Sequence, residues 1–166
     1  MPSRWNVPGL QIRAAGAADA PVILAFIKKL AAYEKLSHEV VANEGLLKET
    51  LFGERPTAEV AIAFLDDRPA GFVLFFHNYS TFLGRPGIYI EDLFVEESYR
   101  RRGIGRALLL YVARLAKERR CGRLEWSVLD WNEPAIRFYE KLGAVPMSEW
   151  TVFRVTGESL EKLADS

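Results

Sequence analysis

The sequence has few of the residues that bind metals or form crosslinks. Cys121 is the single cysteine among 166 residues, so it cannot form an intramolecular disulfide. The two histidines, His38 and His77, have no metal-ligand spacing to the cysteine or to a carboxylate pair. We therefore expect no metal. Because no signal-peptide pattern follows Met1, we expect a cytoplasmic protein.

The sequence also lacks an excess of one charge and any long apolar run. Lysine and arginine total 22, as do aspartate and glutamate, so no net field attracts the chain to nucleic acid or to an anionic membrane. No apolar run approaches the ~20 residues that span a bilayer. We expect neither nucleic-acid nor membrane partners, and we predict a single domain over residues 1–166, with a core from about 10 to 155.

Local patterns in the first part of the chain predict two helices and four strands. Apolar residues recur at helical spacing after Asp19 and Pro21, which favour a helix start, and this helix ends near Lys35. A shorter helix lies between Asn43, a capping residue, and Gly53. Strands rich in Val, Ile and Phe are expected at 10–14, 60–65, 71–77 and 87–95, the last three forming an antiparallel meander.

The rest of the chain alternates helices with strands. We expect a helix over 104–120, a strand near 124–128, a helix over 132–142 and a final strand over 150–155. Because a helix separates strands 87–95 and 124–128, this crossover makes the two strands parallel. The predicted fold class is α+β: a mixed, mostly antiparallel sheet of about six to seven strands flanked by about four helices.

The segment from Val95 to Arg106 joins a predicted strand to a predicted helix and is rich in arginine and glycine. A helix N-terminus offers unpaired N–H groups and the positive end of the dipole, and glycines let an anion approach the backbone. The segment is therefore a candidate phosphate-binding loop. The alternative is that Gly103 and Gly105 only shape a turn and that the arginines form a solvated face.

Two common nucleotide-binding patterns fit this loop poorly. The Walker A motif needs a Gly-Lys-Ser/Thr triplet, which the sequence lacks. The Rossmann fingerprint needs a third glycine where Leu108 stands, and it needs glycines directly after the strand, whereas Glu96 to Arg102 intervene. A dinucleotide oxidoreductase is therefore a distant alternative.

A third pattern, Arg/Gln-x-x-Gly-x-Gly/Ala, fits the segment Arg100-Arg-Arg-Gly103-Ile-Gly105. This segment resembles the acetyl-CoA pyrophosphate loop of GNAT acetyltransferases. Upstream, 89–95 resembles the family's splayed strand, and downstream, 131–144 resembles its asparagine-plus-tyrosine helix. The resemblance extends from about residue 10 to 155 and implies the GNAT fold, with a parallel strand pair splayed at the acetyl-CoA site.

Within that superfamily the chain is most similar to the diamine acetyltransferases, which include the spermidine/spermine N1-acetyltransferases and their thialysine-acetylating relatives. The similarity is carried by the segments 32–35, 52–54, 91–92 and 131–134. It implies a small cationic amine as the substrate, acetyl-CoA as the co-substrate and a homodimer as the assembly.

Position by position, the resemblance implies two sets of contact residues. Acetyl-CoA contacts are implied for Leu93, Phe94, Val95, Arg100, Arg101, Arg102, Gly103, Ile104, Gly105, Arg106, Asn132, Glu133, Pro134 and Ala135. Substrate contacts are implied for Tyr33, Glu34, Glu91, Asp92 and Glu149.

Acetyl transfer to an amine requires two proton movements. An alkylammonium with a pKa of about 10 must lose a proton before it attacks, and Glu91 acting through water is the leading candidate base. The departing thiolate needs a proton, which the phenol of Tyr139 can donate, although helical spacing alone would make Tyr139 a core aromatic. Glu91 and Asp92 are adjacent, so they would face opposite sides of a regular strand unless a bulge intervenes.

The sequence thus predicts direct acetyl transfer to a primary amine in a ternary complex. Cys121 has no neighbouring histidine motif that would activate it as an acyl carrier. Rival acceptors for the same fold are an amino acid, an aminoglycoside or a protein N-terminus. A rival from another class is a non-catalytic acyl-CoA-binding module.

Overall fold

The computed structural model describes residues 4–166. Its internal contacts divide the chain into two units, the first ending at Ser127 and the second beginning at Val128. In the described residues, no helix has both the length and the apolar character needed to cross a membrane.

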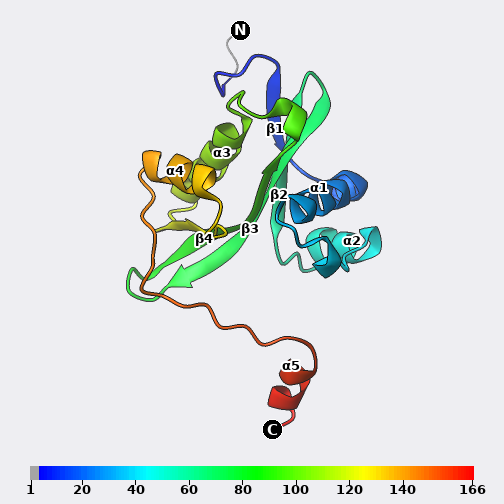
Figure 1. The fold of residues 1–166 in the computed structure, drawn as a ribbon, viewed down its shortest axis with the longest axis vertical. Helices are drawn as coiled ribbons and strands as arrows, with labels where there is room; N and C mark the ends of the chain where they lie inside the picture. The colour runs from blue at the N-terminus through cyan, green and yellow to red at the C-terminus, as the bar shows by residue number, and fades with distance from the viewer. Residues whose placement is uncertain (1–3) are drawn as a thin grey trace. The chain divides into compact units, whose positions relative to one another are not determined.

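A mixed sheet forms the centre of the first unit (Figure 1). In the described chain it contains five strands in sequence order, β1 (Leu10–Ala14), β2 (Glu59–Leu65), β3 (Arg68–Ser80), β4 (Arg85–Val95) and β5 (Leu124–Trp126). The first four strands pair antiparallel, whereas β5 runs parallel to β4. The predicted meander and the parallel crossover are confirmed, but the sheet has fewer strands than we expected.

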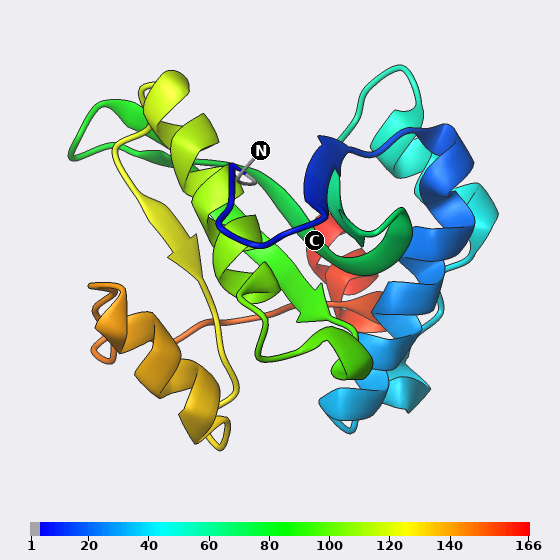
Figure 2. The same cartoon turned by 90° about the horizontal axis from the view of Figure 1, so that it is seen from above.

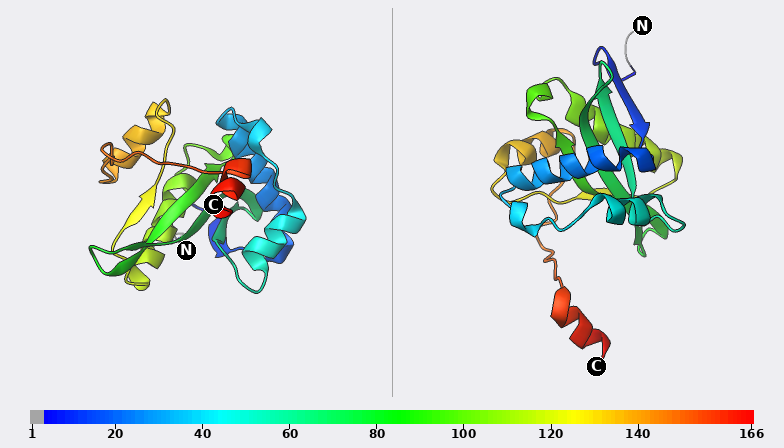
Figure 3. Two further views of the ribbon diagram at one scale, coloured as in Figure 1. Left: turned by 90° about the horizontal axis from the view of Figure 1, so that it is seen from below. Right: turned by 90° about the vertical axis from the view of Figure 1, so that its right-hand side faces the viewer.

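Helices cover both faces of this sheet (Figures 1 and 2). One face carries α1 (Ala20–Tyr33) and α2 (Glu44–Phe52), and the other carries α3 (Ile104–Glu118). Figure 3 shows α1 lying across the strands. The Phe26 ring of α1 stacks on that of Phe72 in β3, with centroids 5.4 Å apart. The side chains that α3 buries recur at helical spacing and include Ile104, Leu108 and Val112, so both faces of the sheet contribute to a core.

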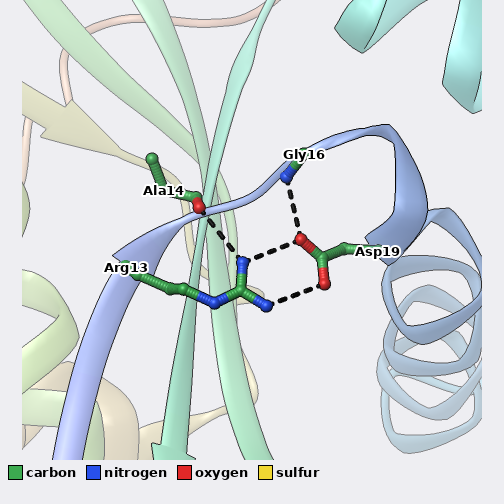
Figure 4. Close-up of polar contacts among 4 residues, drawn as sticks. All are labelled: Arg13, Ala14, Gly16 and Asp19. Atoms are coloured by element: carbon green, nitrogen blue, oxygen red, sulfur yellow. Dashed lines mark hydrogen bonds and ion pairs between the residues drawn. The ribbon is translucent and has the colours of Figure 1, made fainter.

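Two predicted helix starts differ in how they are capped. Asn43 caps α2 as expected, because its Oδ1 accepts a hydrogen bond from the N–H of Leu46 at 2.9 Å. Asp19 precedes α1 but does not cap it through its side chain. Its carboxylate instead accepts hydrogen bonds from the N–H of Gly16 at 2.8 Å and from the Arg13 guanidinium at 2.9 and 3.0 Å (Figure 4). The bidentate Arg13 partner lowers the pKa of Asp19 and ties β1 to the start of α1.

The second unit contains two helices, α4 (Glu133–Lys141) and α5 (Gly157–Ala164). Pro134 lies in the first turn of α4, and Gly143, with a φ of 92°, follows its end, both as expected. The prediction of a final strand over 150–155 is wrong, because this segment has no regular secondary structure. Its alternating apolar residues suit a strand, but a strand needs a partner, and 150–155 pairs with no strand of the described chain. Helix α5 was not predicted.

Candidate functional site

A bulge in β4 accounts for the placement of two adjacent carboxylates. Leu74 of β3 pairs with Asp92 and Phe75 pairs with Ile90, so Glu91 is an extra residue in β4. Such a residue interrupts the alternation of side chains between the two faces of a sheet. As a result, Glu91 and Asp92 line the same cavity, which regular alternation would not allow.

The end of α1 delivers a third carboxylate to this cavity. The N–H of Leu36 donates to the carbonyl of Ala31 at 2.7 Å, and the N–H of Lys35 donates to that of Ala32 at 3.1 Å. This is the hydrogen-bond pattern of a Schellman motif, which needs a left-handed residue directly after the helix. Lys35 takes that conformation with a φ of 62°, although it is not glycine. The sharp turn leaves Glu34 at the cavity and folds the following segment back beside α1.

The cavity has a volume of about 400 Å³ and combines acidic and apolar walls. Its acidic residues are Glu34, Glu39, Glu91 and Asp92, and its apolar residues are Ile27, Leu30, Ala31, Leu36, Val40, Val41 and Ala42. None of the described residues that line it is basic. The cavity therefore suits a ligand with a positive charge and a hydrocarbon portion.

The crowding of carboxylates perturbs their protonation. Burial, and then the charges of Glu91 and Glu34, raise the pKa of Asp92 to about 6. Burial, and then Glu91, also raise the pKa of Glu34. A bound cation would relieve this repulsion, so the negative charges of the cavity favour the binding of an ammonium group.

The loop before α3 has the backbone of an anion-binding site. Arg101 and Gly103 both take left-handed conformations, with φ values of 65° and 86°, and Gly103 is the N-cap of α3. Such residues turn successive N–H groups toward one side of the chain. A Cβ on Gly105 would lie 3.7 Å from Val95 and 3.8 Å from Leu93, so Gly105 faces the last residues of β4. The first turn of α3 contains no acidic residue that would repel an anion.

Next to this loop, β4 extends past its pairing with β5. The parallel ladder between them ends at Ile90 and Trp126, whereas β4 continues to Val95. The stretch with Leu93, Phe94 and Val95 therefore has backbone groups that β5 does not pair. This agrees with the splayed strand expected from the sequence.

Two contacts link the loop to α1. Lys29 of α1 forms an ion pair with Glu96, the first residue after β4. The Arg100 guanidinium carbon lies 5.0 Å from the centre of the Tyr33 ring and 5.5 Å from that of Phe94. The Nε–H of Arg100 donates a hydrogen bond to the carbonyl of Val95 at 2.9 Å. The loop and the end of α1 are therefore joined by side chains.

The remaining site candidates belong to the second unit. Asn132 occupies the N-cap position of α4, but its side chain makes no capping hydrogen bond. The carboxylate of Glu133 pairs with Arg137 at 2.8 Å, and Pro134 and Ala135 follow in the first turn. Tyr139 lies near the end of α4, with its ring centre 5.5 Å from that of Phe138. Glu149 lies in an exposed turn after α4.

Sequence reasoning missed Glu39 and the apolar wall formed by Val40, Val41 and Ala42. These residues lie in a loop without periodicity, and only the turn at Lys35 brings them to the cavity. An acidic residue shortly after Glu34 was the available signal. In the described part of the chain, no group of three or more His, Cys, Asp or Glu residues is arranged to hold a metal ion.

Comparisons with known proteins identify the family. The acetyltransferase (GNAT) family model matches residues 27–144. The L-ornithine N5-acetyltransferase of Arabidopsis thaliana is 36% identical and is aligned over 92% of this chain and 87% of its own. The thialysine N-epsilon-acetyltransferase of Bos taurus is 38% identical, with 93% and 97% covered.

A solved structure has a similar fold. An integron cassette protein from the mobile metagenome of V. cholerae superposes with a TM-score of 0.80 at 28% identity, covering 95% of this chain and 99% of that one. The family match spans more than half of the chain and includes the Arg- and Gly-rich loop. The chain therefore belongs to the GNAT family of acetyltransferases, enzymes that use acetyl-CoA as their co-substrate.

Proposed function

We propose that this enzyme transfers an acetyl group directly from acetyl-CoA to a primary amine of a small cationic acceptor, such as a diamine, a polyamine or a lysine-like amine. The observation that supports the proposal is the cavity with four carboxylates and an apolar wall. One carboxylate can hold the reacting amine and another can hold a second cation, while methylene groups contact the wall. The relatives named for ornithine and thialysine favour the same class of acceptor.

The residues have distinct roles in this proposal. Glu91 accepts a proton from the bound ammonium through water, because an amine with a pKa of about 10 is protonated at neutral pH. Asp92 and Glu34 hold the positive charge, and Tyr33 and Glu149 complete the acceptor contacts. The phenol Oη of Tyr139 donates a proton to the departing thiolate sulfur.

The loop residues fit a CoA pyrophosphate. Gly103 supplies the left-handed turn, Gly105 adds no side chain on the side that faces Val95 and Leu93, and the surrounding arginines supply positive charge. When bound, acetyl-CoA supplies the activated thioester. We assign the pyrophosphate to Arg101, Arg102, Gly103, Ile104, Gly105 and Arg106, and the pantetheine arm to the backbone of Leu93, Phe94 and Val95. The first turn of α4, with Asn132, Glu133, Pro134 and Ala135, completes these contacts.

A comparison of acceptors tests this proposal. We expect kcat/KM to be higher for L-ornithine and thialysine than for a neutral or singly charged amine of equal length. Glu34→Gln should reduce this preference by about ten-fold, because it removes one charge from the cavity. Glu39→Gln should reduce it less, because the Glu39 side chain is 71% exposed and its carboxylate lies 3.3 Å from His38. Glu49→Gln, an exposed change in α2, is the matched control. If the enzyme binds acetyl-CoA but acetylates no amine, it is a binding module. If it prefers an aminoglycoside or a peptide N-terminus, the acceptor class is wrong.

We also propose that the enzyme is a cytoplasmic homodimer and that residues 1–166 act as one acetyltransferase domain. The dimer is supported by the segment 150–155, in which Trp150, Val152 and Phe153 are 76%, 82% and 92% exposed. Exposed apolar side chains that are close together in sequence gain free energy when another surface covers them. We expect this partner to be a second copy of the chain, because most soluble oligomers are symmetric homo-oligomers.

A further inference from the structure

Arg100 begins the glycine-rich motif, yet the contacts of its side chain lie on the side of the loop that faces α1. Its Nε–H is bonded to the carbonyl of Val95, and its guanidinium lies over the rings of Tyr33 and Phe94. A side chain held in this way has its planar face covered by aromatic rings and one of its N–H groups engaged.

We propose that Arg100 is a positioning residue for the acceptor cavity, which holds Tyr33 and the end of α1 against the cofactor loop instead of binding a phosphate. The inference rests on the proposed function, because it assigns to Arg100 an effect on amine binding. It gives Arg100 a role different from the phosphate-binding role proposed for the other arginines of the loop.

The spacing of the contacts supports this role. Lys29 and Tyr33 are one helical turn apart on α1, so they lie on the same side of the helix. Their partners, Glu96 and Arg100, have the same separation along the loop. Two successive turns of α1 are thus held by two loop residues that are four positions apart. Glu34, which lines the cavity, directly follows Tyr33.

The other loop arginines are placed differently. The arginines at 100, 101, 102 and 106 are all exposed, so their contacts and not their burial distinguish them, and Arg101 has a left-handed backbone conformation. Arg102 is also exposed and contacts Tyr99 within the loop, with its guanidinium carbon 5.7 Å from the ring centre. These side chains remain beside the left-handed turn at Gly103, where a pyrophosphate would bind.

The inference predicts opposite effects for two matched substitutions. Arg100→Gln should raise the KM for L-ornithine by about five-fold, as expected for the loss of its cation–π contact with Tyr33, while the Kd for acetyl-CoA changes less than about two-fold. Arg102→Gln should raise the Kd for acetyl-CoA and leave the KM for L-ornithine nearly unchanged. Calorimetry gives the Kd, and steady-state kinetics give the KM.

Substitutions of Tyr33 test whether Arg100 acts through the ring. Tyr33→Phe keeps the aromatic face, so the effect of Arg100→Gln should persist in this background. Tyr33→Leu removes the face, so Arg100→Gln should then add little to the rise in KM. Wild type, Arg100→Gln, Tyr33→Leu and the double variant should also show coupling between the two positions in their melting temperatures, which confirms that each variant is folded.

The inference is overturned if Arg100→Gln weakens acetyl-CoA binding as much as Arg102→Gln does. It is also overturned if the effects at Arg100 and Tyr33 are independent in both KM and melting temperature. If the wild-type enzyme acetylates no amine, the proposed function fails. The calorimetric Kd values and the coupling in melting temperature then still decide the assignment of Arg100.

Discussion

Asp92 carries the most perturbed carboxylate of the cavity, with a pKa raised to about 6 by burial and by the charges of Glu91 and Glu34. A raised pKa means that the folded state binds the proton more tightly than the unfolded chain. The folded protein therefore loses stability as pH rises from the ordinary pKa of 3.8 through about 6, and the full cost is present at higher pH.

Asp92→Asn should accordingly stabilise the protein at pH 8 and do so much less at pH 4. The expected gain at pH 8 is up to roughly 2–3 kcal/mol, the equivalent of the pKa shift. Melting temperatures of wild type, Asp92→Asn and the exposed control Glu49→Gln, measured across this pH range, provide the test. A gain that is equal at both pH values would contradict the assigned cost of ionisation. The variant should lose affinity for a cationic acceptor despite its greater stability.

Tyr139→Phe should lower kcat by about ten- to a hundred-fold while leaving acetyl-CoA affinity and the melting temperature nearly unchanged. The substitution keeps the ring beside Phe138 and removes only the hydroxyl. Tyr79→Phe, at an exposed tyrosine of β3, is the matched control. A fully active Tyr139→Phe enzyme would instead assign Tyr139 to packing.

At the scale of elements, the two glycines of the loop have separable roles. Gly103→Ala places a Cβ at a φ of 86° and should destabilise the protein by about 1–2 kcal/mol. Gly105 has an ordinary helical backbone, so Gly105→Ala should stabilise the ligand-free protein by up to about 1 kcal/mol. The same variant should weaken acetyl-CoA binding by about ten-fold, because the methyl group would lie against Val95 and Leu93, which we assign to the pantetheine arm.

Gly45→Ala, at the same position in the first turn of α2, is the control for acetyl-CoA affinity. It does not match the stability change, because its Cβ would lie 3.2 Å from the capping Oδ1 of Asn43. Thermal unfolding reports stability and calorimetry reports acetyl-CoA affinity. Binding that is unaffected by Gly105→Ala would show that the glycine serves the fold and not the ligand.

The same scale shows which elements the sequence could predict. Helix α2 is defined locally by Asn43 at one end and Gly53 at the other, so a single sequence suffices to place it. The bulge at Glu91 depends on how β3 and β4 align, and no local pattern records it. The segment 150–155 has the composition of a strand, but its conformation depends on a pairing partner. Local signals therefore predicted most of the elements, tertiary pairing decided the bulge and the missing strand, and α5 was missed.

The candidate site, like the fold, could be predicted only in part from local sequence signals. Glu34 and Glu91 could be selected from motifs, and they line one cavity, while their role as acceptor contacts stays a prediction. Glu39 joins them only because Lys35 adopts a left-handed conformation, which its residue type does not predict. The contacts of Arg100 with Tyr33 likewise depend on the packing of α1 beside the loop.

At the scale of the whole molecule, the proposed homodimer can be tested through its exposed apolar segment. Phe153→Asp should shift the protein toward the monomer, because burial of a charge in an interface is costly. Phe82→Asp, at another fully exposed aromatic, should leave the association unchanged. Sedimentation over a range of concentrations measures both. A wild-type protein that is monomeric at all concentrations would contradict the dimer.

The early end of the β4–β5 ladder has a consequence for solubility. A strand edge that lacks a partner is a template for pairing with other chains, which leads to aggregation. The stretch of β4 that β5 does not pair begins with the bulge at Glu91 and the charge of Asp92. These two features discourage pairing with another chain. Glu91→Val combined with Asp92→Val should therefore increase light scattering on storage, whereas Glu49→Val should not. The carboxylates assigned to the acceptor would then also keep the enzyme dispersed at high concentration.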